Sequence, residues 1–151
     1  MSRNVLGTNV VTQVALVVRN AETTAAAWAE LLGVDPLEIG LTKPDEGEGT
    51  MYRGRPTQGR AKLAFFDLGS VRLEIIEPVG GPSTWAEHLD RHGEGVHHIA
   101  FRIQGMDEKL SRLAEHGLPT VQAGYFTGGR YGYVGSEPKL GVVLELLEHF
   151  G

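Results

Sequence analysis

Two halves of this sequence resemble each other, and this repetition restricts the possible fold more than any other feature. Residues 71–77 (VRLEIIE) and 142–148 (VVLELLE) have nearly the same sequence. A weaker match relates residues 12–18 (TQVALVV) to residues 97–103 (HHIAFRI). Residues 12–18 and 97–103 are each followed by a helical pattern, and residues 71–77 and 142–148 each have the pattern of a strand. We therefore expect two copies of one structural unit.

The first half predicts a strand, a helix and then three further strands. The valine-rich segment 10–18 predicts the first strand. The helix is expected over about 21–32, with Asn20 as its N-terminal cap and Gly33 as its end. Residues 35–60 contain several prolines and glycines, which indicate a long loop. The remaining strands are expected at about 50–54, 61–68 and 71–77.

The second half predicts the same order of elements. A strand over 96–103 leads into a helix over about 106–116. The three closing strands are expected near 119–123, 130–135 and 141–148. The linker before this half contains a short helix, in which Thr84 and Glu87 have the spacing of a capping box.

These elements predict an α+β fold in a single domain over 1–151. It has one βαβββ module over about 10–77, a linker helix within 78–95 and a second module over about 96–148. One four-stranded module alone would leave a face of its sheet uncovered. The two modules are therefore expected to pack against each other or to pair with a second chain.

Composition excludes several classes of protein. The net charge of -5 and the pI near 5.7 argue against nucleic-acid binding. The absence of cysteine excludes disulfide scaffolds and thiol catalysis. No apolar run approaches the roughly 18 residues of a membrane span, and the first residues do not have the pattern of a signal peptide. We expect a cytoplasmic protein without a nucleic-acid or membrane partner.

Four polar side chains fall on the strand face that points away from the predicted helices. Side chains alternate between the two faces of a strand, and the neighbours on this face are mostly apolar. The four residues are Gln13, Glu74, His98 and Glu145. A buried carboxylate without a partner is costly. Two carboxylates, an imidazole and an amide would suit one divalent ion such as Zn, Ni, Co, Mn or Mg. In the alternative interpretation, Arg72 and Arg102 pair with the carboxylates and His98 is an ordinary hydrogen-bonded sheet histidine.

The chain resembles the vicinal oxygen chelate superfamily, which includes glyoxalase I, methylmalonyl-CoA epimerase, extradiol dioxygenases and bleomycin-resistance proteins. The resemblance rests on the repeated modules, the run GVHHIAF at 95–101 and the ending VLEL at 143–146, and covers about 10–148. Within the superfamily, the sequence most resembles methylmalonyl-CoA epimerase, as in LEIIEP at 73–78. The resemblance implies a U-shaped open barrel, a homodimer and a metal held by one residue from each of four strands. Carried over by position, these ligands are Gln13, Glu74, His98 and Glu145.

The ligand set and its surroundings combine features of two activities in this superfamily. Gln, Glu, His and Glu resemble the ligands of glyoxalase I, whereas epimerases usually have histidine in place of Gln13. Val17 and Pro78 stand where glyoxalase I has the arginine and asparagine that help to hold glutathione. Residues 60–63 (RAKL) include no second acid of the kind that epimerases use. The resemblance therefore does not select one activity.

A metal ion in this place favours proton transfer at a carbon next to a carbonyl group. Glu145 is the first candidate for the general base and Glu74 the second. The enzyme would be an isomerase, an epimerase or a lyase acting on a small molecule such as a CoA thioester. Candidates for substrate binding are Arg130, Tyr131 and Tyr133 in the strand after a glycine-rich turn, together with Arg102.

Two other functions are compatible with parts of the sequence, and three other histidines have structural interpretations. A metal-free protein of the bleomycin-resistance type would bind an aromatic natural product. A ring-cleaving dioxygenase would hold iron, but such a site favours two histidines and one carboxylate, which Gln13 does not supply. His97 is expected to point to the opposite face from His98 and to be structural. His88 and His92 are expected on a solvated helix face.

Overall fold

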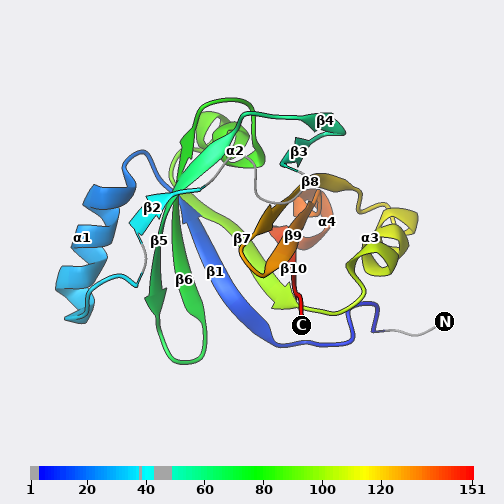
Figure 1. Cartoon of the computed structure of the whole chain (residues 1–151), viewed down its shortest axis with the longest axis horizontal. Coiled ribbons are helices and arrows are strands. Elements are labelled where there is room, and N and C mark those ends of the chain that lie inside the picture. The colour runs from blue at the N-terminus through cyan, green and yellow to red at the C-terminus, as the bar shows by residue number, and fades with distance from the viewer. Residues whose placement is uncertain (1–3, 38, 43–48) are drawn as a thin grey trace.

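The computed structural model describes residues 4–37, 39–42 and 49–151, and its strands form one mixed sheet. The strands are β1 Val11–Val17, β2 Ile39–Leu41, β3 Met51–Tyr52, β4 Arg55–Pro56, β5 Arg60–Asp67, β6 Arg72–Val79, β7 Gly95–Arg102, β8 Thr120–Phe126, β9 Gly129–Val134 and β10 Val143–His149. The helices are α1 Ala21–Leu32, α2 Thr84–His92, α3 Met106–Glu115 and α4 Glu137–Leu140. The sheet order is β2-β5-β6-β1-β7-β10-β9-β8-β3-β4. The sheet curls around an open interior, as Figure 1 shows.

The sheet confirms the predicted repetition of the two halves. β1 runs parallel to β6 in the first half, and β7 runs parallel to β10 in the second. The two pairs meet where β1 and β7 run antiparallel at the centre of the sheet. The registers are equivalent, because Ala15 is opposite Glu74 and Ala100 is opposite Glu145. The two carboxylates therefore flank the central strand pair from its two sides.

The helices α1 and α3 cover the outer face of the sheet, as alternation predicts (Figure 1). Under α1, a buried cluster contains Phe66, Leu73 and Ile75. Under α3, another contains Leu144 and Leu146. A third cluster lines the interior, with Ala15, Val17, Ala61, Ile76, Trp85, Tyr133 and Val143. Burial of alternate side chains on both faces fixes the strand register, since a shift by one residue would exchange the faces.

The ends of α1 are confirmed, whereas the predicted cap of α2 was wrong by one residue. The Asn20 side chain accepts a hydrogen bond from the Thr23 backbone N–H at 2.9 Å, and Gly33 ends the helix with a φ of 72°. At α2, the capping residue is Ser83, whose side chain accepts from the Ala86 N–H at 3.0 Å. Thr84 is already helical, because the extended backbone that a cap requires belongs to Ser83.

The segment expected to form the second strand of the first half does not pair with the other strands of that half. Residues 51–56 form the hairpin β3–β4, which pairs with β8 of the second half. The place next to β5 is taken by β2, which the sequence analysis did not predict. The short helix α4 was also not predicted. Residues 38 and 43–48 of the expected loop lie outside the described residues.

The central strand pair carries a bulge directly before each of its two polar candidates. Val11 is opposite Phe101 and Gln13 is opposite Ala100, which leaves Thr12 as an extra residue. In β7, His97 is the extra residue, since His98 is opposite Ala15 and Val96 is opposite Leu16. Bulges are frequent beside active sites, where they change the direction of a side chain. Gln13 and His98 are thus placed by equivalent irregularities in the two halves.

We predict that Gly129→Ala destabilises the pairing of β9 with β10. A Cβ atom at this position would overlap the Glu148 backbone oxygen and the Phe126 ring. Such overpacking typically costs about 1–3 kcal/mol. Urea unfolding should therefore show a lower midpoint for this variant. Gly40→Ala in β2 is the matched control, because no described atom beyond its two chain neighbours lies within 4 Å of the added Cβ. An equal effect of both substitutions would contradict the prediction.

Among the helices that the structure describes, none has the length and apolar character needed to cross a membrane.

Candidate functional site

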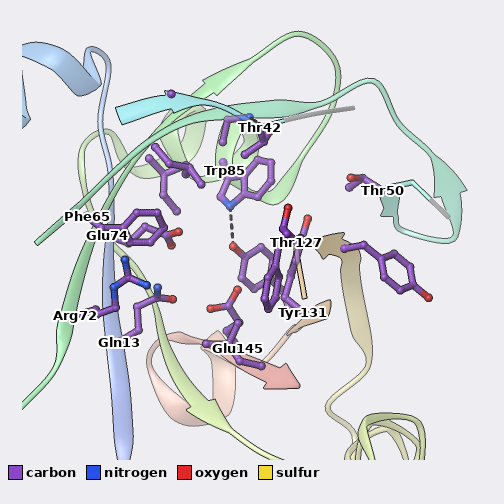
Figure 2. A pocket seen from close by; sticks show the side chains of 18 of the residues that line it. Gln13, Thr42, Thr50, Phe65, Arg72, Glu74, Trp85, Thr127, Tyr131 and Glu145 are labelled. Carbon is purple, nitrogen blue, oxygen red and sulfur yellow. Dashed lines mark hydrogen bonds between the residues drawn. The ribbon is translucent and has the colours of Figure 1, made fainter. Parts of the chain in front are cut away.

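The inner face of the curled sheet encloses a cavity of about 580 Å³. Its wall combines strands of both halves with Trp85 of α2, as Figure 2 shows. Aromatic side chains dominate one part of the wall: Phe65, Trp85, Tyr125, Phe126, Tyr131 and Tyr133. The carboxylates of Glu74 and Glu145 point into the space between these rings (Figure 2). The cavity therefore offers an apolar enclosure with a small polar group at its base.

The four polar residues singled out by strand alternation converge at this base. The Nε2 atom of His98 lies 3.1 Å from Oε1 of Glu145 and 3.4 Å from Oε1 of Glu74. The same nitrogen lies 3.4 Å from Oε1 of Gln13. All four side chains are buried, and His98 is fully inaccessible. Their convergence follows from the equivalent registers of the two halves.

Two buried carboxylate oxygens at this base have no hydrogen-bond partner in the described part of the chain. They are Oε1 of Glu74 and Oε1 of Glu145. Both lie within ion-pair distance of His98, but the geometry of a hydrogen bond is absent. An uncompensated buried carboxylate is costly, so these oxygens fit a bound cation. One nitrogen and three oxygens form a donor set that suits a divalent metal.

The donor atoms are nevertheless close to one another rather than spread around an ion. Among the described residues, no group of three or more histidine or acidic side chains stands in a metal-binding arrangement. A metal would have to separate the His98 imidazole from both carboxylates. The donor atoms are therefore of the types that bind a divalent ion, but the side chains must move apart before an ion can fit between them.

Charges at the base of the cavity compensate one another in this arrangement. Burial alone would lower the pKa of His98, but the negative charges of Glu145 and Glu74 raise it to about 9. Burial raises the pKa of Glu74, although His98 acts in the opposite direction. The two carboxylates therefore favour the protonated imidazole, in the place where a metal ion would carry the positive charge.

The arginines do not pair with the site carboxylates as the alternative interpretation expected. The Arg72 guanidinium lies over the Phe65 ring, 4.3 Å from its centroid, and lines the cavity. No ion pair within 4 Å joins it to a described acidic residue. Arg102 is exposed and is not among the described residues that line the cavity. Arg72 therefore places a positive charge at the cavity wall with no ion-pair partner among the described carboxylates.

The residues suggested for substrate binding separate onto the two faces of β9. Tyr131 and Tyr133 line the cavity. Arg130 points the other way, and its guanidinium pairs with Glu148 at 2.8 Å and with Asp107 at 3.1 Å. Neighbouring residues of a strand point to opposite faces, so Arg130 and Tyr131 are on opposite sides of this wall.

Sequence reasoning did not identify Trp85 and Gln122, which hold the two tyrosines in place. Nε1 of Trp85 donates a hydrogen bond to the Tyr133 hydroxyl at 3.0 Å. Nε2 of Gln122 donates to the Tyr131 hydroxyl at 3.0 Å, while its Oε1 accepts from the Thr84 backbone N–H at 2.8 Å. Burial raises the pKa of both tyrosines, so they remain protonated. A lone tryptophan in a linker helix was the only available signal for Trp85.

His97 differs from the expectation that its ring points away from His98. Its side chain is buried, and its Nδ1 atom lies 2.8 Å from Nδ1 of His98. The reason is the bulge, because an extra residue in β7 breaks the simple alternation of faces. His88 is half-buried and its ring lies 5.5 Å from that of His97, whereas His92 is exposed as expected.

Comparisons with known proteins agree with this architecture. A sequence profile of the Glyoxalase/Bleomycin resistance protein/Dioxygenase superfamily matches residues 12–134. The Bacillus subtilis protein named "Uncharacterized protein YqjC" is 32% identical over 108 residues, which cover 70% of this chain and 77% of that protein. An ethylmalonyl-CoA/methylmalonyl-CoA epimerase from Cereibacter sphaeroides is 25% identical over 129 residues, which cover 85% of this chain and 77% of that protein. The crystal structure of methylmalonyl-CoA epimerase from Mycobacterium tuberculosis matches with a TM-score of 0.69 and 19% identity, covering 100% of this chain and 93% of that one.

Proposed function

The chain belongs to the glyoxalase/bleomycin resistance protein/dioxygenase superfamily, and on this premise we propose that it is a metal-dependent enzyme of the epimerase or isomerase type. It would move a proton at the carbon atom next to a substrate carbonyl group. The observation that carries this proposal is the pair of orphaned carboxylate oxygens beside the His98 imidazole, at the base of a largely apolar cavity.

In this proposal, one residue from each of four strands holds a single divalent ion. The ligands are Gln13 of β1, Glu74 of β6, His98 of β7 and Glu145 of β10. When bound, the ion supplies a positive charge that polarises the substrate carbonyl and stabilises negative charge developing on its oxygen. The apolar wall around the base excludes water, which strengthens electrostatic interactions there.

The proton would be taken by one of the two carboxylates at the base. Among the described residues that line the cavity, Glu74 and Glu145 are the only acids. They lie on opposite sides of the central strand pair, at equivalent registers. We assign proton abstraction first to Glu145, with Glu74 acting from the other side. An inversion of configuration needs such a pair, because the proton leaves one face of the carbon and returns to the other.

The substrate class in this proposal is an acyl thioester that carries a carboxylate next to the reacting carbon. The curated relative from Cereibacter sphaeroides is named for ethylmalonyl-CoA and methylmalonyl-CoA, which have this chemistry. In this chain, Arg72 supports the same class, because its guanidinium lines the cavity and pairs with no described acid within 4 Å. A guanidinium binds a carboxylate through two parallel hydrogen bonds.

Arg72→Gln should weaken binding of a carboxylated substrate while metal binding is unchanged. Hydrogen bonds to charged groups contribute about 1.5–3 kcal/mol, which corresponds to roughly a 10- to 100-fold increase in KM. Steady-state kinetics with methylmalonyl-CoA would measure it. Arg112→Gln on the outer helix α3 removes the same charge far from the cavity and is the control. An unchanged KM in Arg72→Gln would argue against this substrate anchor.

The proposed activity is tested by proton exchange in D₂O. The protein is loaded separately with Zn, Ni, Co, Mn and Mg, and NMR follows loss of the α-proton signal of methylmalonyl-CoA and ethylmalonyl-CoA. Exchange that depends on the ion supports the proposal. Failure of the protein to bind any of these ions would refute metal dependence. Binding of an ion without exchange would refute the assigned substrate class.

A metal-free binding protein of the bleomycin-resistance type is the second candidate. It is favoured by the aromatic wall and by the contact that His98 already makes with both carboxylates. Equilibrium dialysis with bleomycin, with and without divalent ions, distinguishes the two functions. The dioxygenase gains no support, because His98 is the one described imidazole within ion-pair distance of Glu74 and Glu145, whereas such an iron site favours two histidines. The homodimer stays a prediction.

A further inference from the structure

We propose that His97 is a positioning residue, which holds the His98 ring in the tautomer that can bind a metal through Nε2. This inference rests on the proposed function, because it concerns the same site. It assigns a role to a histidine that does not itself line the substrate cavity. The two rings are in contact, and their four nitrogen atoms have different surroundings.

The bulge in β7 brings the two neighbouring histidines into contact. His97 is the extra residue between the pairs Val96–Leu16 and His98–Ala15. Its Nδ1 atom lies 2.8 Å from Nδ1 of His98, and the rings are nearly perpendicular at 83°. Both side chains are almost completely buried. A nitrogen–nitrogen contact of this length is a hydrogen bond, and only one of the two atoms can carry the hydrogen.

The direction of this hydrogen bond follows from the other nitrogen of His98. Nε2 of His98 faces the oxygens of Glu145, Glu74 and Gln13. To bind a metal there, Nε2 must have a free lone pair, so a neutral His98 must carry its hydrogen on Nδ1. Nδ1 then donates to His97. The opposite direction would place the hydrogen of neutral His98 on Nε2 and block the metal.

The surroundings of His97 are consistent with its role as the acceptor. Its Nε2 atom has no hydrogen-bond partner among the described residues, and the residue borders a second cavity of about 530 Å³. Neutral His97 can carry its hydrogen on Nε2, which leaves the lone pair of Nδ1 to accept the hydrogen bond. Contacts with the rings of His88 at 5.5 Å and Tyr133 at 5.2 Å hold this orientation. Partners that orient a metal-binding histidine typically contribute 10- to 100-fold to metal affinity.

Three substitutions of His97 distinguish a role in hydrogen bonding to His98 from a role in packing alone. His97→Asn retains an acceptor oxygen near the place of Nδ1, His97→Gln places its amide near the place of Nε2, and His97→Leu has no acceptor. Competition with a chromophoric chelator measures Zn²⁺ affinity. We expect His97→Asn to stay close to the wild type, and both His97→Gln and His97→Leu to lose roughly 10- to 100-fold. His92→Leu is the matched control and should keep the wild-type affinity, because His92 borders the same second cavity and its ring contacts that of His88.

NMR of the metal-free, ¹⁵N-histidine-labelled protein tests the direction of the hydrogen bond without any metal or activity. We expect a scalar coupling between the two Nδ1 atoms, with the His97 hydrogen on Nε2. A hydrogen on Nδ1 of His97 would overturn the inference, as would equal affinity losses in all three variants or no loss in any. Thermal unfolding confirms that each variant is folded. If the wild type binds no Zn²⁺, the proposed function fails in its metal dependence, whereas the NMR result still decides the hydrogen bond by itself.

Discussion

Replacement of His98 by alanine should abolish binding of a divalent ion. Among the four proposed ligands, His98 contributes the imidazole, and its Nε2 atom is the point to which the oxygens of Glu74, Glu145 and Gln13 converge. We expect an affinity loss of at least about 100-fold, the upper end of what loss of an orienting partner alone costs. Elemental analysis after chelator-free purification would show about one equivalent in the wild type and almost none in the variant.

The control for this experiment is His116→Ala, a histidine that follows the outer helix α3. Removal of His98 also leaves two buried carboxylates without their cation, which destabilises the fold. His98→Gln is therefore measured beside His98→Ala, because its amide retains a polar group at the base of the cavity. Thermal unfolding identifies any variant that is not folded. Unchanged metal content in a folded His98 variant would contradict the assigned ligand set.

Glu145→Gln should remove proton transfer while the metal remains bound. The amide retains an oxygen ligand, as Gln13 does, but cannot act as a base at neutral pH. Loss of a general base typically lowers the rate by about 10²- to 10⁴-fold. NMR in D₂O measures α-proton exchange of methylmalonyl-CoA by the metal-loaded variant, and elemental analysis verifies its metal content.

Glu74→Gln is the matched variant from the equivalent register of the first half. If the two carboxylates act from opposite sides of the substrate, each variant should lose exchange with a different enantiomer. Both should lose inversion of configuration. Full exchange of both enantiomers in either metal-loaded variant would exclude that carboxylate as a base. If Glu145→Gln lost exchange of both enantiomers and Glu74→Gln lost neither, all proton transfer would be assigned to Glu145.

The sequence by itself predicted the repeated modules, the helix α1 and the face on which Gln13, Glu74, His98 and Glu145 lie. These features depend on short-range periodicity, since strands alternate every residue and helices repeat about every 3.6 residues. The resemblance between the two halves also predicted that Glu74 and Glu145 occupy equivalent positions. Together these patterns predicted which side chains share the interior, although they did not show how close the donor atoms lie.

Features that depend on pairing between distant segments became visible in the folded chain alone. The hairpin β3–β4 crosses from the first half to β8 of the second, which no local pattern indicated. The position of Trp85 against Tyr133 depends on how α2 packs over the interior. The contact of His97 with His98 requires a bulge, which exists only in relation to the partner strand. Register, bulges and packing are properties of two segments at once, and a pattern within one segment does not contain them.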